Sequence, residues 1–144
     1  HYLPYHTGSS FEQRFLEEVL AMSELEQLDL EVYYNGDRAL TEFKIKCYQG
    51  NSGSWKYVGM YTPDFLILKR KDGKIYKAII VETKGANDPM FREKRFFMER
   101  EFVRQNNAKY QYQRFDYLYL EDSWLEAERI RMTHERICAF FREI

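Results

Sequence analysis

The sequence predicts an α/β fold with a central mixed β-sheet and helices on both of its faces, in the order α-β-β-β-α-β-α. At 144 residues the chain is long enough for one domain, 1–144, with its own hydrophobic core. Residues 65–68 and 78–81 are apolar at every position, and strands of that kind are covered on both sides of their sheet. Stretches with helical periodicity before and after them supply the cover.

The first half of the chain predicts one helix and two strands. Residues 9–28 form the helix, because Ser9 and Glu12 have capping-box spacing and the apolar residues that follow share one broad face. Residues 39–48 alternate apolar and polar side chains, which is typical of a half-buried strand. A second strand runs from about residue 55 to 70 and is interrupted near Pro63.

The second half predicts two strands, each followed by a helix. Residues 74–84 form the third strand. Asp88 and Pro89 suit the N-cap and the first turn of a helix that continues to about residue 105. The fourth strand is 115–121, and Ser123 caps a last helix that extends to about residue 142.

Composition indicates where such a chain functions. Cys47 and Cys138 lie far apart without zinc-ligand spacing, which fits a reduced, cytoplasmic protein better than a disulfide scaffold. No apolar stretch approaches the roughly 20 residues of a membrane span, so we expect no membrane partner. His134 has no metal-ligand spacing either, and we expect it to be a surface residue. The chain begins at a histidine, and we expect it to be a fragment of a larger multidomain protein.

The net charge of −1 hides an uneven distribution. Residues 1–42 hold nine acids and two bases, residues 43–114 hold sixteen bases and seven acids, and residues 115–144 hold seven acids and four bases. A basic middle segment can attract a polyanion such as DNA. Ordinary solvated helix faces and strand edges explain the same distribution.

Asp64 and Glu82 lie near the far ends of the two most apolar strands, which are joined by a charged turn. A two-residue turn of Asp72 and Gly73 would direct these two acids to opposite faces, because side chains alternate along a strand. A three-residue loop, 71–73, with Gly73 left-handed makes Asp64 and Glu82 diagonal neighbours on one face, together with Lys84. We expect the second register, which a bulge near Pro63 would also produce.

Two converging carboxylates repel each other unless a cation lies between them. Oxygen ligands favour hard ions, so Asp64 and Glu82 predict a Mg²⁺ site at which Mn²⁺ can substitute, with the backbone carbonyl of Thr83 as a further ligand. Lys84 shares the face of Glu82, where an ammonium can position a water or stabilise charge on a phosphate. The alternative is a surface aspartate beside a simple Glu–Lys ion pair.

The segment PDFLILKRKDGKIYKAIIVETKG, residues 63–85, resembles the core motif of the PD-(D/E)XK nuclease superfamily, with Pro63-Asp64 followed by Glu82-Thr83-Lys84. The predicted order of elements over about residues 9–121 resembles the restriction-endonuclease-like core of that family. The resemblance implies Mg²⁺-dependent hydrolysis of phosphodiester bonds in DNA, less often in RNA. It also implies that the lysine assists the water.

The family often adds an acid from its first helix and a Lys or Gln from its second. The matching residues here are Glu12, as a further catalytic acid and metal ligand, and Lys94. Glu12 also completes the capping box with Ser9. Lys94 is equally consistent with a lysine that extends its ammonium past the core to solvent.

The opening YLPYHTGSSFEQRFLEEVL, the phrase VETKG and the later FDYLYLED resemble the C-terminal endonuclease domain of type III restriction enzymes, whose subunits carry a linked helicase. This implies double-stranded DNA, a helicase or translocase domain of the same polypeptide and a modification subunit as partners. Cutting both strands would require a second copy, hence a homodimer. Transposon-end nucleases, junction-resolving nucleases and a non-catalytic nucleic-acid-binding relative remain alternatives.

Overall fold

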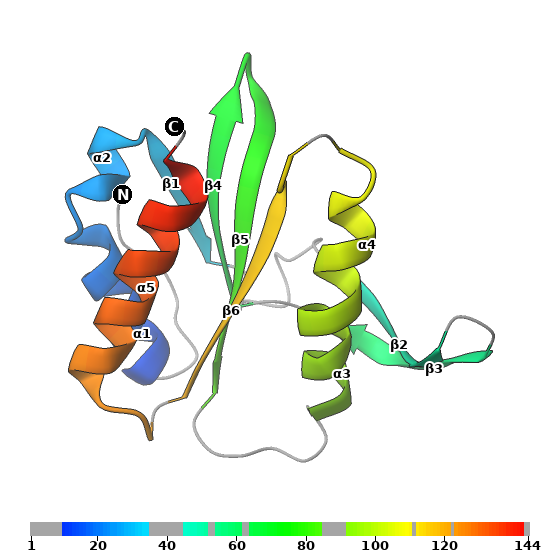
Figure 1. Cartoon of the computed structure of the whole chain (residues 1–144). Helices are drawn as coiled ribbons and strands as arrows, with labels where there is room; N and C mark the ends of the chain where they lie inside the picture. The colour runs from blue at the N-terminus through cyan, green and yellow to red at the C-terminus, as the bar shows by residue number, and fades with distance from the viewer. Residues whose placement is uncertain are drawn as a thin grey trace.

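The computed structural model describes residues 10–34, 45–51, 54–61, 64–84, 92–110, 112–121 and 123–142 of the chain. Within these ranges it is an α/β structure in which a four-stranded sheet separates two groups of helices (Figure 1). The predicted class, a mixed sheet with helices on both faces, is confirmed.

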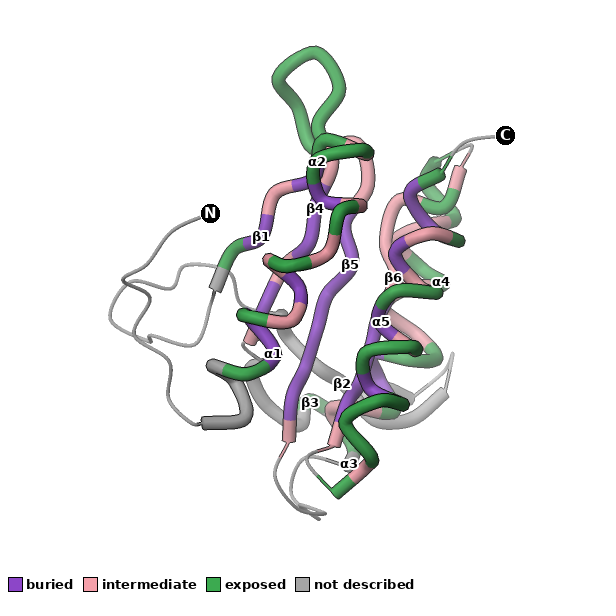
Figure 2. Tube along the Cα trace, turned by 90° about the vertical axis from the view of Figure 1, so that its left-hand side faces the viewer, coloured by how far each residue is buried: buried purple, intermediate pink, exposed green. Residues whose placement is uncertain are grey.

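The central sheet contains β1 (Leu30–Tyr34), β4 (Phe65–Lys71), β5 (Lys74–Lys84) and β6 (Phe115–Glu121), in the spatial order β1-β4-β5-β6. β4 pairs antiparallel with both β1 and β5, whereas β5 and β6 run parallel. The parallel pair is connected through helices, as a parallel connection requires. Because β5 is central, it is buried from residue 78 to residue 83 (Figure 2).

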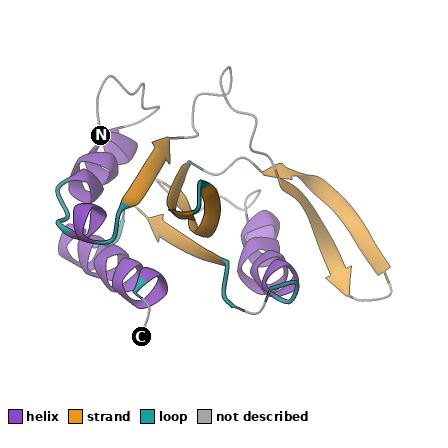
Figure 3. Cartoon of the chain, turned by 90° about the horizontal axis from the view of Figure 1, so that it is seen from above, coloured by secondary structure: helices purple, strands orange, loops and turns teal. Residues whose placement is uncertain are grey.

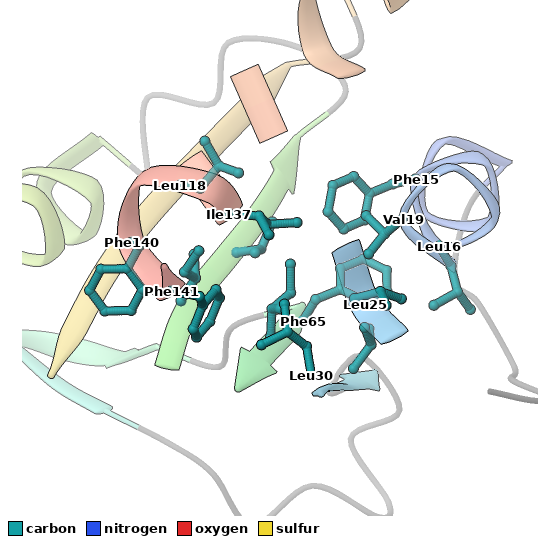
Figure 4. Packing of buried hydrophobic residues seen from close by; sticks show 14 of the residues in the cluster. Phe15, Leu16, Val19, Leu25, Leu30, Phe65, Leu118, Ile137, Phe140 and Phe141 are labelled. Carbon is teal, nitrogen blue, oxygen red and sulfur yellow. The ribbon is translucent and has the colours of Figure 1, made fainter. Parts of the chain in front are cut away.

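One face of the sheet is covered by α1 (Ser10–Leu20), α2 (Glu24–Gln27) and α5 (Glu126–Phe141) (Figures 1 and 3). The ring of Phe15 on α1 lies 4.9 Å from that of Phe65 on β4, centroid to centroid, and Ile137 on α5 is fully buried against the same cluster. Figure 4 shows these side chains converging between the helices and the strands. Removing a ring such as Phe65, which is 0% exposed, would leave a cavity in the centre of this cluster.

The opposite face is covered by one continuous helical run, formed by α3 (Arg92–Phe96), the π-helical turn η1 (Phe97–Phe102) and α4 (Val103–Asn107). Phe97 and Met98 pack there on Ile80, Tyr117 and Tyr119. Odd-numbered positions of β5 such as Ile79 and Val81 belong to the first cluster, and Ile80 belongs to the second. Because side chains alternate along β5, this strand contributes residues to both hydrophobic clusters.

The prediction of the first half was wrong about which strands form the sheet. β1 was not predicted, although Leu30 and Val32 alternate as buried residues with exposed Tyr33. The stretch predicted as one strand, 55–70, is two strands in different sheets. β3 (Ser54–Tyr61) pairs with β2 (Ile45–Asn51) in a separate two-stranded sheet beside α3 and η1, and β4 takes the central position. Residues 39–44 lie outside the described residues.

Two predicted helix boundaries were also wrong. The helix predicted over 9–28 ends at Leu20 and resumes as α2, because the N–H of Met22 bonds the Val19 carbonyl in a tighter turn and Leu25 turns into the core. The last helix begins at Glu126 with Leu125 at its N-cap. Ser123, the predicted cap, instead donates a hydrogen bond to Glu121 at 3.0 Å. The start predicted at Asp88 lies outside the described residues.

Within the described part of the chain, none of the helices combines the length and apolar character needed to cross a lipid bilayer. The longest, α5, has 16 residues and carries charged side chains on its outer face.

Glu18 on α1 lies near Glu126 at the start of α5, where the two helices meet. Burial raises the pKa of Glu18, and the neighbouring carboxyl group of Glu126 raises it further. A folded-state pKa above the unfolded-state value means that ionising Glu18 lowers stability. That cost is present at neutral pH and disappears below the unfolded-state pKa, which is about 4.3 for glutamate.

We therefore expect Glu126→Gln to raise the melting temperature at pH 7, because Glu18 then ionises beside a neutral side chain, and to lose most of this gain at about pH 4, where Glu18 becomes protonated. Thermal unfolding at the two pH values measures the difference. Glu128→Gln is the matched control, because Glu128 is paired with Arg131 and its loss should not stabilise the protein. An equal gain at both pH values would contradict this account.

Candidate active site at the end of the sheet

The turn between β4 and β5 fixes how the two predicted acids align. It is a two-residue turn in which Asp72 and Gly73 have φ of 54° and 78°, so the predicted three-residue loop was wrong. Aspartate tolerates this left-handed conformation better than most residues, and two such residues in succession are typical of a tight hairpin. Immediately beyond the turn, Arg70 pairs with Ile75.

A bulge then changes the register, because Lys69 pairs with Lys77 and leaves Tyr76 as the extra residue of β5. The carbonyl of Tyr76 accepts a hydrogen bond from the hydroxyl of Tyr112 at 3.0 Å, and the ammonium of Lys71 lies 4.2 Å from the centre of its ring. The bulge lies beside the turn, and Pro63, near which we expected one, lies outside the described residues. The bulge brings the backbone of Asp64 level with that of Glu82, by another route than the longer loop that we expected.

Asp64 precedes β4 by one residue, and Phe65 pairs with Val81. Continuing this register by one residue places Asp64 level with Glu82, not with Ile80 as the predicted register required. Asp64 Oδ2 accepts hydrogen bonds from the backbone N–H of Thr83 at 3.0 Å and from its hydroxyl at 2.8 Å. The carboxylate thus extends the β4–β5 ladder past the end of β4 and is held in one position.

Glu82 lies on the face of β5 that α3 and η1 cover, and its side chain is only 3% exposed. Lys84 follows on the same face with its Nζ 4.0 Å from Glu82 Oε1, and its side chain is 31% exposed. A buried carboxylate is unfavourable unless a cation or hydrogen-bond donors compensate it. Lys84 therefore combines a contact to the buried acid with access to solvent.

The neighbouring strand β6 contributes residues that the sequence analysis missed. Tyr119 pairs with Glu82 and Glu121 with Lys84, and parallel strands end at the same edge of a sheet. The Tyr119 hydroxyl donates to Glu121 Oε1 at 2.9 Å. Burial, with help from this hydrogen bond, raises the pKa of Tyr119 to about 12. The phenol therefore stays protonated near neutral pH and acts as a donor, not as a base.

Arg95 on α3 brings a second cation to this end of the sheet. Its guanidinium lies 3.6 Å from the centre of the Tyr119 ring, and its Nε donates to Glu99 Oε1 at 2.7 Å. Lys94, the residue predicted on this helix, is half-buried beside it. Arg95 thus contacts the site strands from α3, through the ring of Tyr119. The local signal in 115–121 was only that Tyr119 and Glu121, two residues apart, share one face of their strand; the pairing of β6 with β5 puts that face on the side of Glu82.

Glu12 belongs to α1, which packs on the other face of the sheet from Glu82. Figures 1 and 2 show that α1 begins at the end of the sheet where β5 finishes. The structure does not describe the side chain of Glu12, so its role as a metal ligand stays a prediction.

The arrangement therefore has two acids level with each other on adjacent strands, a lysine beside the buried acid, and a tyrosine and an arginine from the neighbouring elements. Carboxylates at a strand end can hold a hard divalent cation, and a half-exposed lysine can meet an anion from solvent. Comparisons of the chain with protein-family models, with curated proteins and with solved structures find no match.

The two hydrogen bonds from Thr83 to Asp64 lead to a test of the geometry. We expect Thr83→Val to lower the free energy of unfolding by about 1–2 kcal/mol, because one donor to a partly buried carboxylate is lost while the side-chain shape is kept. Thr83→Ser keeps the hydroxyl and should cost less. Urea denaturation measures both variants, and equal losses would show that the hydroxyl does not matter.

Proposed function

We propose that this chain is a Mg²⁺-dependent nuclease domain that hydrolyses phosphodiester bonds in DNA at the end of β4 and β5. The observation that carries the proposal is the nearly buried Glu82, with the Lys84 ammonium 4.0 Å from its carboxylate and Asp64 level with it on the next strand. The resemblance of residues 63–85 to the PD-(D/E)XK motif assigns chemistry to the same three residues.

The residues at this end of the sheet fit a hard cation. Both hydrogen bonds from Thr83 go to Oδ2 of Asp64 and fix the orientation of the carboxylate. The other oxygen, Oδ1, takes part in neither of these two bonds. In a strand the N–H and C=O of one residue point to the same edge, so the Thr83 carbonyl points to the side from which Asp64 approaches. The residue before Asp64 is proline, which has no N–H with which to occupy a carbonyl of β5.

Asp64 Oδ1, Glu82 and the Thr83 carbonyl would therefore hold the ion, with Glu12 as a further acid if its side chain reaches the site. The bound ion supplies a coordinated water of lowered pKa and charge neutralisation at the phosphate. The set consists only of oxygens, which suits Mg²⁺ or Mn²⁺.

Lys84 would orient the attacking water and stabilise negative charge on the phosphate, since its ammonium is held beside Glu82 and is still accessible. Lys94 and Arg95 place further positive charge on α3, where the DNA backbone could be bound through its phosphates. The phenol of Tyr119 supports Glu121 and stacks under Arg95, and so positions the arginine without itself touching the reacting atoms.

The finer assignment is that this domain is the cleavage module of a type III-like restriction enzyme. The resemblance of its opening, of VETKG and of FDYLYLED to that group supports it. Under this assignment a translocase domain of the same polypeptide and a modification subunit would select the DNA, and a second copy would cut the other strand.

Mn²⁺ titration of the purified chain, followed by calorimetry, tests the metal site. We expect binding in the wild type and its loss in Asp64→Asn and Glu82→Gln, because each variant removes a charged oxygen ligand. Asp72→Asn makes the same chemical change at the opposite end of the same hairpin, where Asn also tolerates the left-handed φ of 54°. It should bind Mn²⁺ like the wild type.

Cleavage of double-stranded DNA with Mg²⁺ tests the catalytic role of the lysine. We expect Lys84→Met to lower the rate by about 10²–10³-fold, which is typical for loss of one group that stabilises transition-state charge. Lys74→Met, at the exposed start of the same strand, is the control and should retain activity. Binding of DNA without Mn²⁺ binding or cleavage would instead favour the non-catalytic nucleic-acid-binding relative.

A further inference from the structure

Three potential metal ligands of different chemistry meet on the face of the sheet opposite to Glu82. Glu24 begins α2, and His134 and Cys138 lie one turn apart on α5. His134 Nε2 is 3.2 Å from Glu24 Oε2 and 3.8 Å from Cys138 Sγ. One ligand atom from each residue lies within 4.8 Å of the other two. The group joins two helices that are far apart in the sequence.

We propose that Glu24, His134 and Cys138 form a Zn²⁺ site, with water as the fourth ligand. Tetrahedral Zn²⁺ bonds sulfur at about 2.3 Å and nitrogen or oxygen at about 2.0–2.2 Å, so its ligand atoms lie roughly 3.3–3.6 Å apart. Two of the three separations, 3.2 and 3.8 Å, differ from this range by only a few tenths of an ångström, and the third, between Glu24 and Cys138, is below 4.8 Å. Side-chain rotations would bring the three ligand atoms to the tetrahedral distances.

The donor set selects the ion. A thiolate and an imidazole are soft or borderline ligands that favour Zn²⁺ over Mg²⁺, which takes oxygen ligands. Residues four apart on a helix project from the same face, so His134 and Cys138 already form a two-ligand clamp before Glu24 joins from α2. Three protein ligands leave one position to water, and the 46% exposed side chain of His134 places the site within reach of solvent.

The site would pin the short helix α2 against α5. α2 has only four residues, too few to be stable by its own backbone bonds. Apart from the metal ligands, it is held through Leu25, which belongs to the hydrophobic cluster under α5. A metal bond between Glu24 and α5 adds a second anchor on the solvent side of the same turn.

The sequence analysis found no metal-ligand spacing at these residues. The only local signal is the i, i+4 spacing of His134 and Cys138, which many surface helices contain by chance. The third ligand comes from a distant part of the chain, and only the packing of α2 beside α5 brings it close.

Co²⁺ substitution tests the site in the full chain, kept reduced with a phosphine. Co²⁺ bound by a thiolate shows a sulfur-to-metal charge-transfer band, and we expect it to saturate at one Co²⁺ per chain and to be displaced by Zn²⁺. Cys138→Ser should abolish the band, while Cys47→Ser, which removes the other thiol of the chain, should leave it intact. The reverse pattern, or no band in the wild type, would overturn the proposal.

The other two ligands are tested by competition of Zn²⁺ with a chelating dye. We expect His134→Asn and Glu24→Gln each to weaken Zn²⁺ binding by at least about tenfold, the lower limit seen even for residues that only support metal ligands. Glu26→Gln on the same short helix is the matched control and should bind like the wild type. All these positions are near the surface, and circular dichroism verifies that each variant folds. Unchanged affinity in His134→Asn would refute a site at these residues.

Zn²⁺ should also raise the melting temperature of the wild type, since an ion that binds only the folded state stabilises it by mass action. We expect no such shift in Cys138→Ser, and the full shift in Asp64→Asn. This last variant separates the two sites, because loss of the proposed Mg²⁺ site leaves the Zn²⁺ response unchanged. A Zn²⁺ shift that disappears in Asp64→Asn and persists in Cys138→Ser would contradict the proposal.

Discussion

The rest of the structure depends on β5, because it joins the antiparallel and the parallel parts of the sheet and is buried on both faces from residue 78 to residue 83. Its odd positions, such as Ile79 and Val81, pack under α1 and α5, and its even position Ile80 packs under η1. The same alternation continues to the end of the strand, where it directs Glu82 and Lys84 to the η1 side and Thr83 to the other. The buried strand itself therefore sets the positions of these polar side chains, and no loop is needed to place them.

The turn decides how the two acids align, although it lies about 30 Å from them along the strand, at about 3.3 Å per residue. The two-residue turn alone would have directed Asp64 and Glu82 to opposite faces. Tyr76 corrects this, because the bulge there shifts the register by one residue and is anchored by the Tyr112 hydroxyl. A bulge is invisible to hydrophobic periodicity, so the sequence predicted that the two acids align from a three-residue loop that the structure does not contain.

Two strands of the central sheet could be predicted to the residue, since 74–84 and 115–121 coincide with β5 and β6. The strand in the first half of the chain, 30–34, could not be predicted, because its apolar residues follow a helical stretch without a glycine or proline between them. Asp29 makes the turn instead, with a φ of 56° that composition does not indicate. The contacts of Tyr119, Glu121 and Arg95 depend on the parallel pairing of β6 with β5, which no local pattern contains.

The two proposed metal sites illustrate how one small domain can keep different ions apart. Asp64, Glu82 and the Thr83 carbonyl offer only oxygen, on the η1 side and at the end of the sheet, whereas Glu24, His134 and Cys138 add sulfur and nitrogen on the outer side of α5. Softness of the ligands then assigns each ion to its site more strongly than charge does. Lys84 lies beside the first set, with its Nζ 4.0 Å from Glu82 Oε1, and would attract a phosphate there. The fold class does not distinguish the two proposed sites, whereas the chemistry of their side chains does.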